Sequence, residues 1–71
     1  MTYVFLEEEK GVYVVAFGND LYDVAIDLDL ENGKYIVYET DLMPDQIDNP
    51  KKLAIQGKIK YVTLLTRCTG A

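Results

Sequence analysis

Three runs of β-branched and aromatic residues constrain the fold of this 71-residue chain more than any other feature. They are Thr2 to Glu7, Val12 to Phe17 and Ile59 to Thr66. Such residues are enriched in β-strands, where successive side chains point to opposite faces. Apolar residues occupy both sets of alternating positions in each run. The sequence therefore predicts three strands that are apolar on both faces.

The first two runs are separated by residues 8–11, which end in Gly11. A short loop that contains glycine between two such runs predicts a β-hairpin, because glycine readily adopts the left-handed conformation that the turn needs. With a three-residue loop Phe5 faces Val15. A four-residue loop changes the partners and still leaves both faces apolar.

A second hairpin is predicted around Asn32 and Gly33. From Val24 to Glu31 apolar and acidic residues alternate with a period of two, which predicts a half-buried strand. The Asn-Gly dipeptide that follows is the strongest short-range signal for a two-residue type I′ turn. The strand 24–31 is therefore expected to pair with residues 34–38 and to carry its carboxylates together on one face.

The stretch from Thr40 to Asn49 is polar and interrupted by Pro44, so it is expected to be irregular. Asn49 and Pro50 fit an N-cap followed by proline at the first helical position, and Gly57 fits a helix end. These signals predict a short helix of about two turns. Residues 50–56 also fit a short strand and turn, so both alternatives stay open.

These patterns predict one small domain over residues 1–71, mainly β and bordering on α+β. About five short antiparallel strands are expected to form a small sheet or a partly open barrel, with one short helix before the last strand. A helix this short cannot cover the second apolar face of the sheet. This predicts a homodimer or higher oligomer, or else a different protein bound to that face.

Charge is unevenly distributed along the chain, whose formal net charge is -5. All twelve acidic residues lie between Glu7 and Asp48, whereas every lysine and arginine except Lys10 and Lys34 follows Asp48. Such asymmetry predicts an electrostatic partner. The alternative is that the basic end folds against the acidic body and neutralises part of it through cross-strand pairs.

Two sets of residues are candidates for binding a partner. The first is an acidic face that would dock on a basic protein surface, where complementary charge speeds and orients the encounter. The second is a loop of apolar anchors among acids, whose apolar residues could instead fold back to cap the sheet. The acidic face comprises Asp20, Asp23, Asp27, Asp29 and Glu31. The loop comprises Asp41, Leu42, Met43, Asp45, Ile47 and Asp48.

The sequence indicates no catalytic, cofactor-binding or metal-binding residue. It has no histidine, the commonest general base and neutral metal ligand, and no base is indicated near its single cysteine, Cys68. Residues 27–38 do not fit an EF-hand loop, because Gly33 falls one place late and Tyr38 replaces the bidentate glutamate. A weak cation contact through the carboxylates of the predicted strand stays open. The dispersed glycines form no phosphate-binding loop.

The sequence therefore predicts a non-enzymatic protein-protein interaction module, an inhibitor or adaptor of the phage or mobile-element type. One alternative is a structural subunit that forms a homo-oligomer. Another is a weak nucleic-acid binder through the basic C-terminal segment, which the net charge opposes. The chain has no basic signal-peptide region, no run of about 18 apolar residues and one cysteine. These features predict a cytoplasmic location away from membranes, in the host cytoplasm if the protein is viral.

Overall fold

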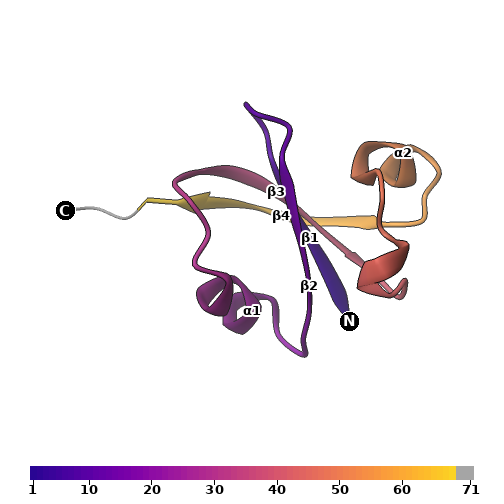
Figure 1. Ribbon diagram of the computed structural model, residues 1–71, viewed down its shortest axis with the longest axis horizontal. Helices are drawn as coiled ribbons and strands as arrows, with labels where there is room; N and C mark the ends of the chain where they lie inside the picture. The colour runs from indigo at the N-terminus through magenta and orange to yellow at the C-terminus, as the bar shows by residue number, and fades with distance from the viewer. Residues whose placement is uncertain (69–71) are drawn as a thin grey trace.

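A four-stranded antiparallel sheet forms the centre of the computed structural model, which describes residues 1–68 (Figure 1). The strands are β1 (Thr2–Glu7), β2 (Tyr13–Phe17), β3 (Gly33–Thr40) and β4 (Lys60–Arg67), in the spatial order β2-β1-β3-β4. The helices are α1 (Leu21–Leu28), the short 3-10 helix η1 (Pro44–Gln46) and α2 (Pro50–Ile55). The mainly β prediction is confirmed. Within residues 1–68 the sheet is open, not a barrel, and has four strands, not five.

Strand β1 lies inside the sheet, and all six of its residues are buried. It pairs antiparallel with β2 on one side and β3 on the other. Val4 lies opposite Val15 of β2, and Phe5 lies opposite Val37 of β3. Because successive side chains alternate, Val4 and Phe5 enter the two opposite faces of the sheet. The predicted two-sided apolar character of this strand thus corresponds to a core on each face.

The backbone N–H of Glu7 donates to the Val12 carbonyl at 2.8 Å, so the hairpin loop between these paired residues contains four residues, 8–11, and sets the register. Val14 lies opposite Phe5, so the four-residue alternative is correct and the three-residue pairing is wrong. Gly11 adopts φ = 71°, a left-handed conformation that costs glycine little and residues with a Cβ more. The predicted role of this glycine is confirmed.

The predicted strand from Val24 to Glu31 is wrong, because residues 21–28 form the helix α1. The apolar residues of this segment fit a strand, in which they alternate, and also a helix, in which they recur every three to four residues. The helical pattern includes Leu21, which lies outside the alternating pattern. The helix buries Leu21, Val24 and Ala25 against the sheet. Both periods fit the sequence, and burial against β1 and β3 favours the helix.

Asn32 and Gly33 lead from α1 into β3 instead of forming a tight turn between two strands. β3 pairs with β1 and β4, and Gly33 at its start lies opposite Arg67. A Cβ added at Gly33 would lie 3.3 Å from Glu7 Cγ. The glycine therefore permits a close approach between β3 and β1, and the type I′ hairpin prediction is wrong.

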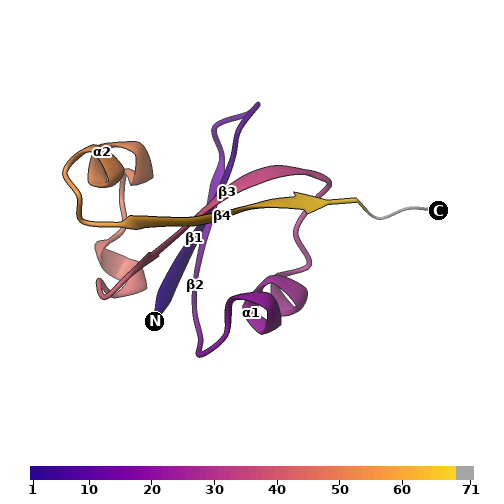
Figure 2. The same cartoon turned by 180° about the vertical axis from the view of Figure 1, so that it is seen from behind.

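Residues 41–59 carry η1 and α2 across the face of the sheet opposite α1 (Figure 2). The predicted short helix is confirmed, and the strand alternative for these residues is wrong. Asn49 Oδ1 accepts a hydrogen bond from the Lys52 backbone N–H at 3.3 Å, and Pro50 is the first helical residue. Gly57 follows the helix with φ = 74°.

Each face of the sheet has its own hydrophobic cluster. The cluster under α1 contains Tyr3, Phe5, Leu21, Val24, Ala25, Leu30, Tyr35 and Val37. The cluster under residues 41–59 contains Val4, Ile47, Leu53 and Ile59. The chain therefore covers both faces of β1 itself, which removes the reason for expecting a second protein on one face. Exposed apolar side chains remain on the edge strands β2 and β4.

Candidate protein-interaction surface

Helix α1 presents neighbouring apolar and acidic side chains to solvent. Tyr22 and Ile26 are 61% and 68% exposed, and Asp23 and Asp27 are exposed beside them. At 3.6 residues per turn these four positions span an arc of about 140°, on the side away from the buried residues. We call Tyr22, Asp23, Ile26 and Asp27 the α1 outer face. Apolar anchors next to a polar rim are typical of protein interfaces.

Asp20 fixes the N-terminal end of α1. Its Oδ1 accepts hydrogen bonds from the backbone N–H groups of Tyr22 at 2.9 Å and Asp23 at 3.2 Å. These N–H groups have no intrahelical partners at the start of a helix, and a negative charge there also complements the helix dipole. Asp20 therefore stabilises the helix that carries the outer face.

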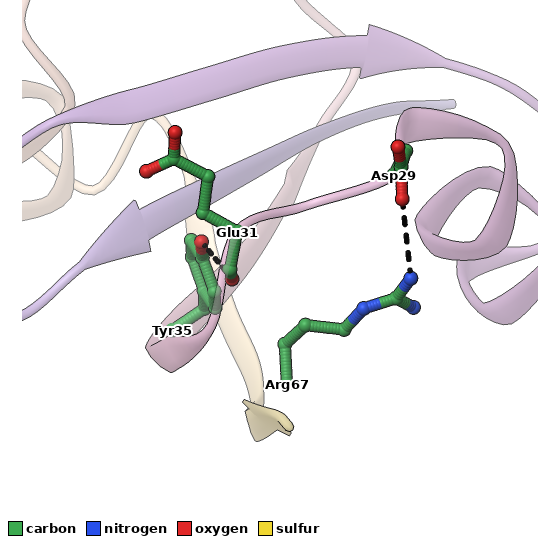
Figure 3. A network of polar contacts seen from close by, with 4 residues as sticks. All are labelled: Asp29, Glu31, Tyr35 and Arg67. Atoms are coloured by element: carbon green, nitrogen blue, oxygen red, sulfur yellow. Dashed lines mark hydrogen bonds and ion pairs between the residues drawn. The ribbon is translucent and has the colours of Figure 1, made fainter. Parts of the chain in front are cut away.

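Two polar contacts fix the C-terminal end of α1 (Figure 3). Asp29 ends the helix in a left-handed conformation with φ = 50°, and its Oδ1 accepts a hydrogen bond from Arg67 Nη2 of β4 at 3.5 Å. The Tyr35 hydroxyl of β3 donates to the Glu31 carbonyl oxygen at 2.6 Å. The residues at the C-terminal end of α1 are thus bonded to the strands β3 and β4.

Tyr35 is 5% exposed in the cluster under α1. Burial raises the pKa of its hydroxyl above the ordinary value of 10.0, and the carboxylates of Glu31 and Glu7 raise it further, while Arg67 opposes them. The hydroxyl is therefore protonated at neutral pH, as its hydrogen bond to the Glu31 carbonyl requires.

The predicted acidic face is distributed over α1 and its two ends, not over one side of a strand. Its members are Asp20, Asp23, Asp27, Asp29 and Glu31. Asp23 and Asp27 lie together on the α1 outer face, and no cation among residues 1–68 lies within ion-pair distance of either. Asp29 has Arg67 as an ion-pair partner. The basic C-terminal segment therefore neutralises part of the predicted set and leaves Asp23 and Asp27 available.

A groove of about 150 Å³ lies between α1 and β4 beside the α1 outer face. Tyr22, Ala25 and Ile26 line one side of it, and Leu65 of β4 lines the other. Tyr22, Ile26 and Leu65 are not members of the predicted surface, and the predicted strand 24–31 places Ile26 on its apolar side. The spacing of four residues between Tyr22 and Ile26 is the signal that places both on one side of a helix.

The predicted binding loop divides into buried and exposed residues. Ile47 is buried in the cluster under residues 41–59, and Leu42 packs against the same cluster, as in the alternative that these residues cap the sheet. Met43 is 54% exposed. The remaining members, Asp41, Asp45 and Asp48, are exposed. Met43 and the three acids are therefore the members positioned to contact a partner directly.

Hydrogen bonds hold this loop on the face of the sheet opposite α1. Thr40 Oγ1 donates a hydrogen bond to the Lys58 carbonyl at 2.9 Å and accepts one from the Leu42 backbone N–H at 3.1 Å. These two bonds connect the beginning and the end of the segment 41–59. The Tyr13 hydroxyl of β2 donates to the Asp48 carbonyl at 3.1 Å. The acidic face and the loop therefore form two separate surfaces on opposite sides of the sheet.

A cavity of about 530 Å³ opens between loop 8–11, the start of β3 and the end of β4. The buried carboxylate of Glu7 borders it and accepts hydrogen bonds from the backbone N–H groups of Glu9 at 3.2 Å and Lys10 at 2.6 Å. Glu7 thus stabilises the turn, and the exposed Cys68 also borders the cavity. Among residues 1–68 no three His, Cys, Asp or Glu side chains gather as metal ligands.

Comparison of the chain with protein-family models, curated proteins and solved structures found no match. The function is therefore inferred from the surface chemistry of the described residues. No helix within residues 1–68 has both the length and the apolar character needed to cross a membrane.

Proposed function

We propose that this protein is a non-enzymatic interaction module that docks the α1 outer face on a basic surface of another protein. The observation that carries this proposal is the exposure of Tyr22 and Ile26, at 61% and 68%, beside the carboxylates of Asp23 and Asp27. The opposite side of the same helix is buried against the sheet. The exposed pair therefore adds little to the core and is free to pack against a partner.

The apolar and acidic residues of the α1 outer face would have different roles in binding. Full burial of a large apolar side chain contributes about 1.5–3 kcal/mol, so Tyr22 and Ile26 supply most of the affinity. Asp23 and Asp27 raise the association rate and set the orientation on a basic partner, an effect that salt screens. Because α1 is already folded and held at both ends, binding orders few additional residues.

An inhibitor or adaptor of the phage or mobile-element type fits this surface, because blocking or bridging another protein requires no catalytic group. An adaptor would use a second surface, which the exposed Met43 and its neighbouring acids supply on the opposite side of the sheet. The proposal places the protein in a reducing cytoplasm, where Cys68, the single cysteine of the chain, stays a thiol.

The test is affinity capture from an extract of the native host with the tagged protein. The wild type should retain a specific protein at low salt and release it at high salt, because screening weakens attraction between exposed charges. The double variant Asp23→Asn/Asp27→Asn should lose that protein. Ile26→Gln should lose it as well, since it removes an apolar anchor and keeps the net charge.

Two matched controls separate the α1 outer face from general effects of charge and hydrophobicity. Glu8→Gln/Glu9→Gln changes the net charge equally at the exposed tip of the first hairpin. Ile55→Gln removes an isoleucine that is 88% exposed on α2. Both controls should retain the partner. Capture of nothing by the wild type, or equal capture by the variants and their controls, would contradict the proposal.

One ion pair and one cross-strand position favour this function over nucleic-acid binding by the basic C-terminal segment. Arg67 has an ion-pair partner in Asp29, and Lys60 lies opposite Glu39 in the sheet. Acids thus accompany both basic residues of β4 and weaken their attraction for phosphate. If the retained material is RNA or DNA, and nuclease treatment abolishes capture, the nucleic-acid alternative replaces the proposal.

A further inference from the structure

The two edge strands of the sheet, β2 and β4, both carry exposed apolar side chains. On β2 and the residue before it these are Val12, Tyr13, Val14 and Phe17, from 37% to 59% exposed. On β4 they are Tyr61, Val62 and Leu64, from 37% to 63% exposed. In residues 1–68 the sheet ends at these strands, so each presents backbone N–H and C=O groups that another strand can pair with.

We propose that a second copy of this chain occupies these edges, with β4 of one copy paired to β2 of the next. The strand directions permit this arrangement. β1 is antiparallel to both β2 and β3, and β3 is antiparallel to β4, so β4 runs opposite to β2. Because the sheet twists, β2 and β4 of one copy cross each other (Figure 1). A second copy that is turned by this twist about the axis across the strands therefore brings its β2 antiparallel to β4, and one twisted antiparallel sheet continues through both copies.

Charge favours this pairing over two copies of the same edge. β4 carries Lys60 and Arg67 at its two ends. A two-fold β4 to β4 contact would bring Lys60 of one copy close to Arg67 of the other, and like charges opposite each other destabilise a sheet. β2 itself has no charged residue. Asp29 and Glu31 line a groove of about 310 Å³ beside it. Asp29 already pairs with Arg67 of its own copy, so Glu31 is the carboxylate left for the basic β4 edge of the next copy.

The side of the sheet to which each side chain points limits the possible registers between β4 of one copy and β2 of the next. Leu64 lies opposite Ile36, Ile36 lies opposite Leu6, and Leu6 lies opposite Tyr13, so all four residues share one side of the sheet. In a continued sheet Leu64 must therefore face Tyr13, or another residue on that side of β2. The pairing then places an apolar residue against an apolar residue, the kind of cross-strand contact that stabilises sheets.

The helices leave room for this assembly on both faces. Four strands at about 4.8 Å each give a repeat of about 19 Å along the sheet, and a helix with its side chains needs about 10–12 Å. The contact is short, because β2 has five residues. A short contact between unlike edges predicts weak assembly that grows with concentration and does not stop at a dimer.

Sedimentation velocity over a range of concentrations tests the proposal with two variants. Val12→Lys/Phe17→Lys damages the β2 edge, and Tyr61→Lys/Leu64→Lys damages the β4 edge. The wild type should sediment progressively faster as its concentration rises, and each variant alone should be monomeric. Mixed together, the variants should form a one-to-one complex that grows no further, because each retains the edge that the other lacks.

Other outcomes overturn the pairing of unlike edges. A wild type that stays monomeric up to submillimolar concentration excludes assembly. A β2-edge variant that dimerises alone indicates β4 to β4 pairing, and a β4-edge variant that dimerises alone indicates β2 to β2 pairing. Far-UV circular dichroism checks that the variants fold. If lysine unfolds either strand, threonine at the same positions removes the apolar contacts while keeping a good strand former.

This assembly does not depend on the proposed docking of the α1 outer face. Asp23→Asn/Asp27→Asn should leave the concentration dependence of sedimentation unchanged while abolishing partner capture. The two edge variants should still capture the partner through α1. Failure of one proposal is therefore distinguishable from failure of the other.

Discussion

Replacement of Tyr35 by phenylalanine tests how the exit of α1 is held to the sheet. The ring is 5% exposed and would stay in place, so the substitution removes only the hydroxyl and its 2.6 Å hydrogen bond to the Glu31 carbonyl. Loss of such a bond costs about 0.5–1.5 kcal/mol in the free energy of unfolding. For a domain of this size, about 1 kcal/mol lowers the melting temperature by about 4–8 °C.

The pH dependence of this difference provides a second, independent measurement. The pKa of Tyr35 in the folded protein lies above its ordinary value of 10.0, because burial and the Glu31 carboxylate disfavour the charged form. The folded state therefore holds this proton more tightly than the unfolded state does. Its stabilising contribution is complete below pH 10 and is lost as the pH rises through the folded-state pKa.

Urea unfolding followed by far-UV circular dichroism, from neutral pH to above pH 10, measures both effects. Wild-type stability should fall more steeply than that of Tyr35→Phe at the alkaline end, so the difference between them narrows. Tyr22→Phe, at a 61% exposed tyrosine, is the matched control and should follow the wild type throughout. Equal stability of wild type and Tyr35→Phe at neutral pH, or parallel curves at alkaline pH, would refute the reasoning.

Three further predictions concern single positions of the fold. Gly18→Ala should lower the free energy of unfolding by about 1–3 kcal/mol in urea titrations, because the added Cβ would overlap Val24 Cγ2. Asp20→Ala should cost about 1 kcal/mol by the same assay, since it removes the N-cap of α1. Ile47→Ala should cost about 2–5 kcal/mol, whereas Met43→Ala, at an exposed residue, should change stability by less than about 0.5 kcal/mol.

Neighbouring exposed residues provide controls for these substitutions. Asn19→Ala, one residue after Gly18, and Asp23→Ala, on the α1 outer face, should each stay within about 0.5 kcal/mol of the wild type. If Gly18→Ala is as stable as Asn19→Ala, the close approach to Val24 does not constrain the loop. If Asp20→Ala matches Asp23→Ala, the cap contributes nothing measurable. Equal losses for Ile47→Ala and Met43→Ala would contradict the division of the loop into buried and exposed residues.

Local sequence patterns predicted an element correctly where they fitted only one type of secondary structure. The runs that became β1, β2 and β4 are rich in β-branched and aromatic residues, which favour strands over helices. Asn49, Pro50 and Gly57 mark the ends of α2 through properties of single residues, namely capping, a fixed φ and a tolerated positive φ. These elements follow from neighbouring residues alone.

Segments with two compatible patterns could not be decided in this way. Residues 24–31 alternate like a strand, and residues 21–28 also repeat like a helix, so the choice depends on which side chains a distant surface can bury. The cluster around Phe5 accepts Leu21 and its helical neighbours from one side of α1. The predicted strand would have placed Ile26 on its apolar side, and the structure leaves it 68% exposed.

The candidate surface shows the same division between local and tertiary information. The separation of acidic from basic residues follows from the order of residues in the chain, and the absence of histidine follows from its composition. The packed fold is needed to show that Asp23 and Asp27 share a surface with Tyr22 and Ile26, and that Arg67 pairs with Asp29. Which side chains meet depends on how α1 and β4 pack on the sheet, and contacts between residues 38 positions apart leave no local pattern to read.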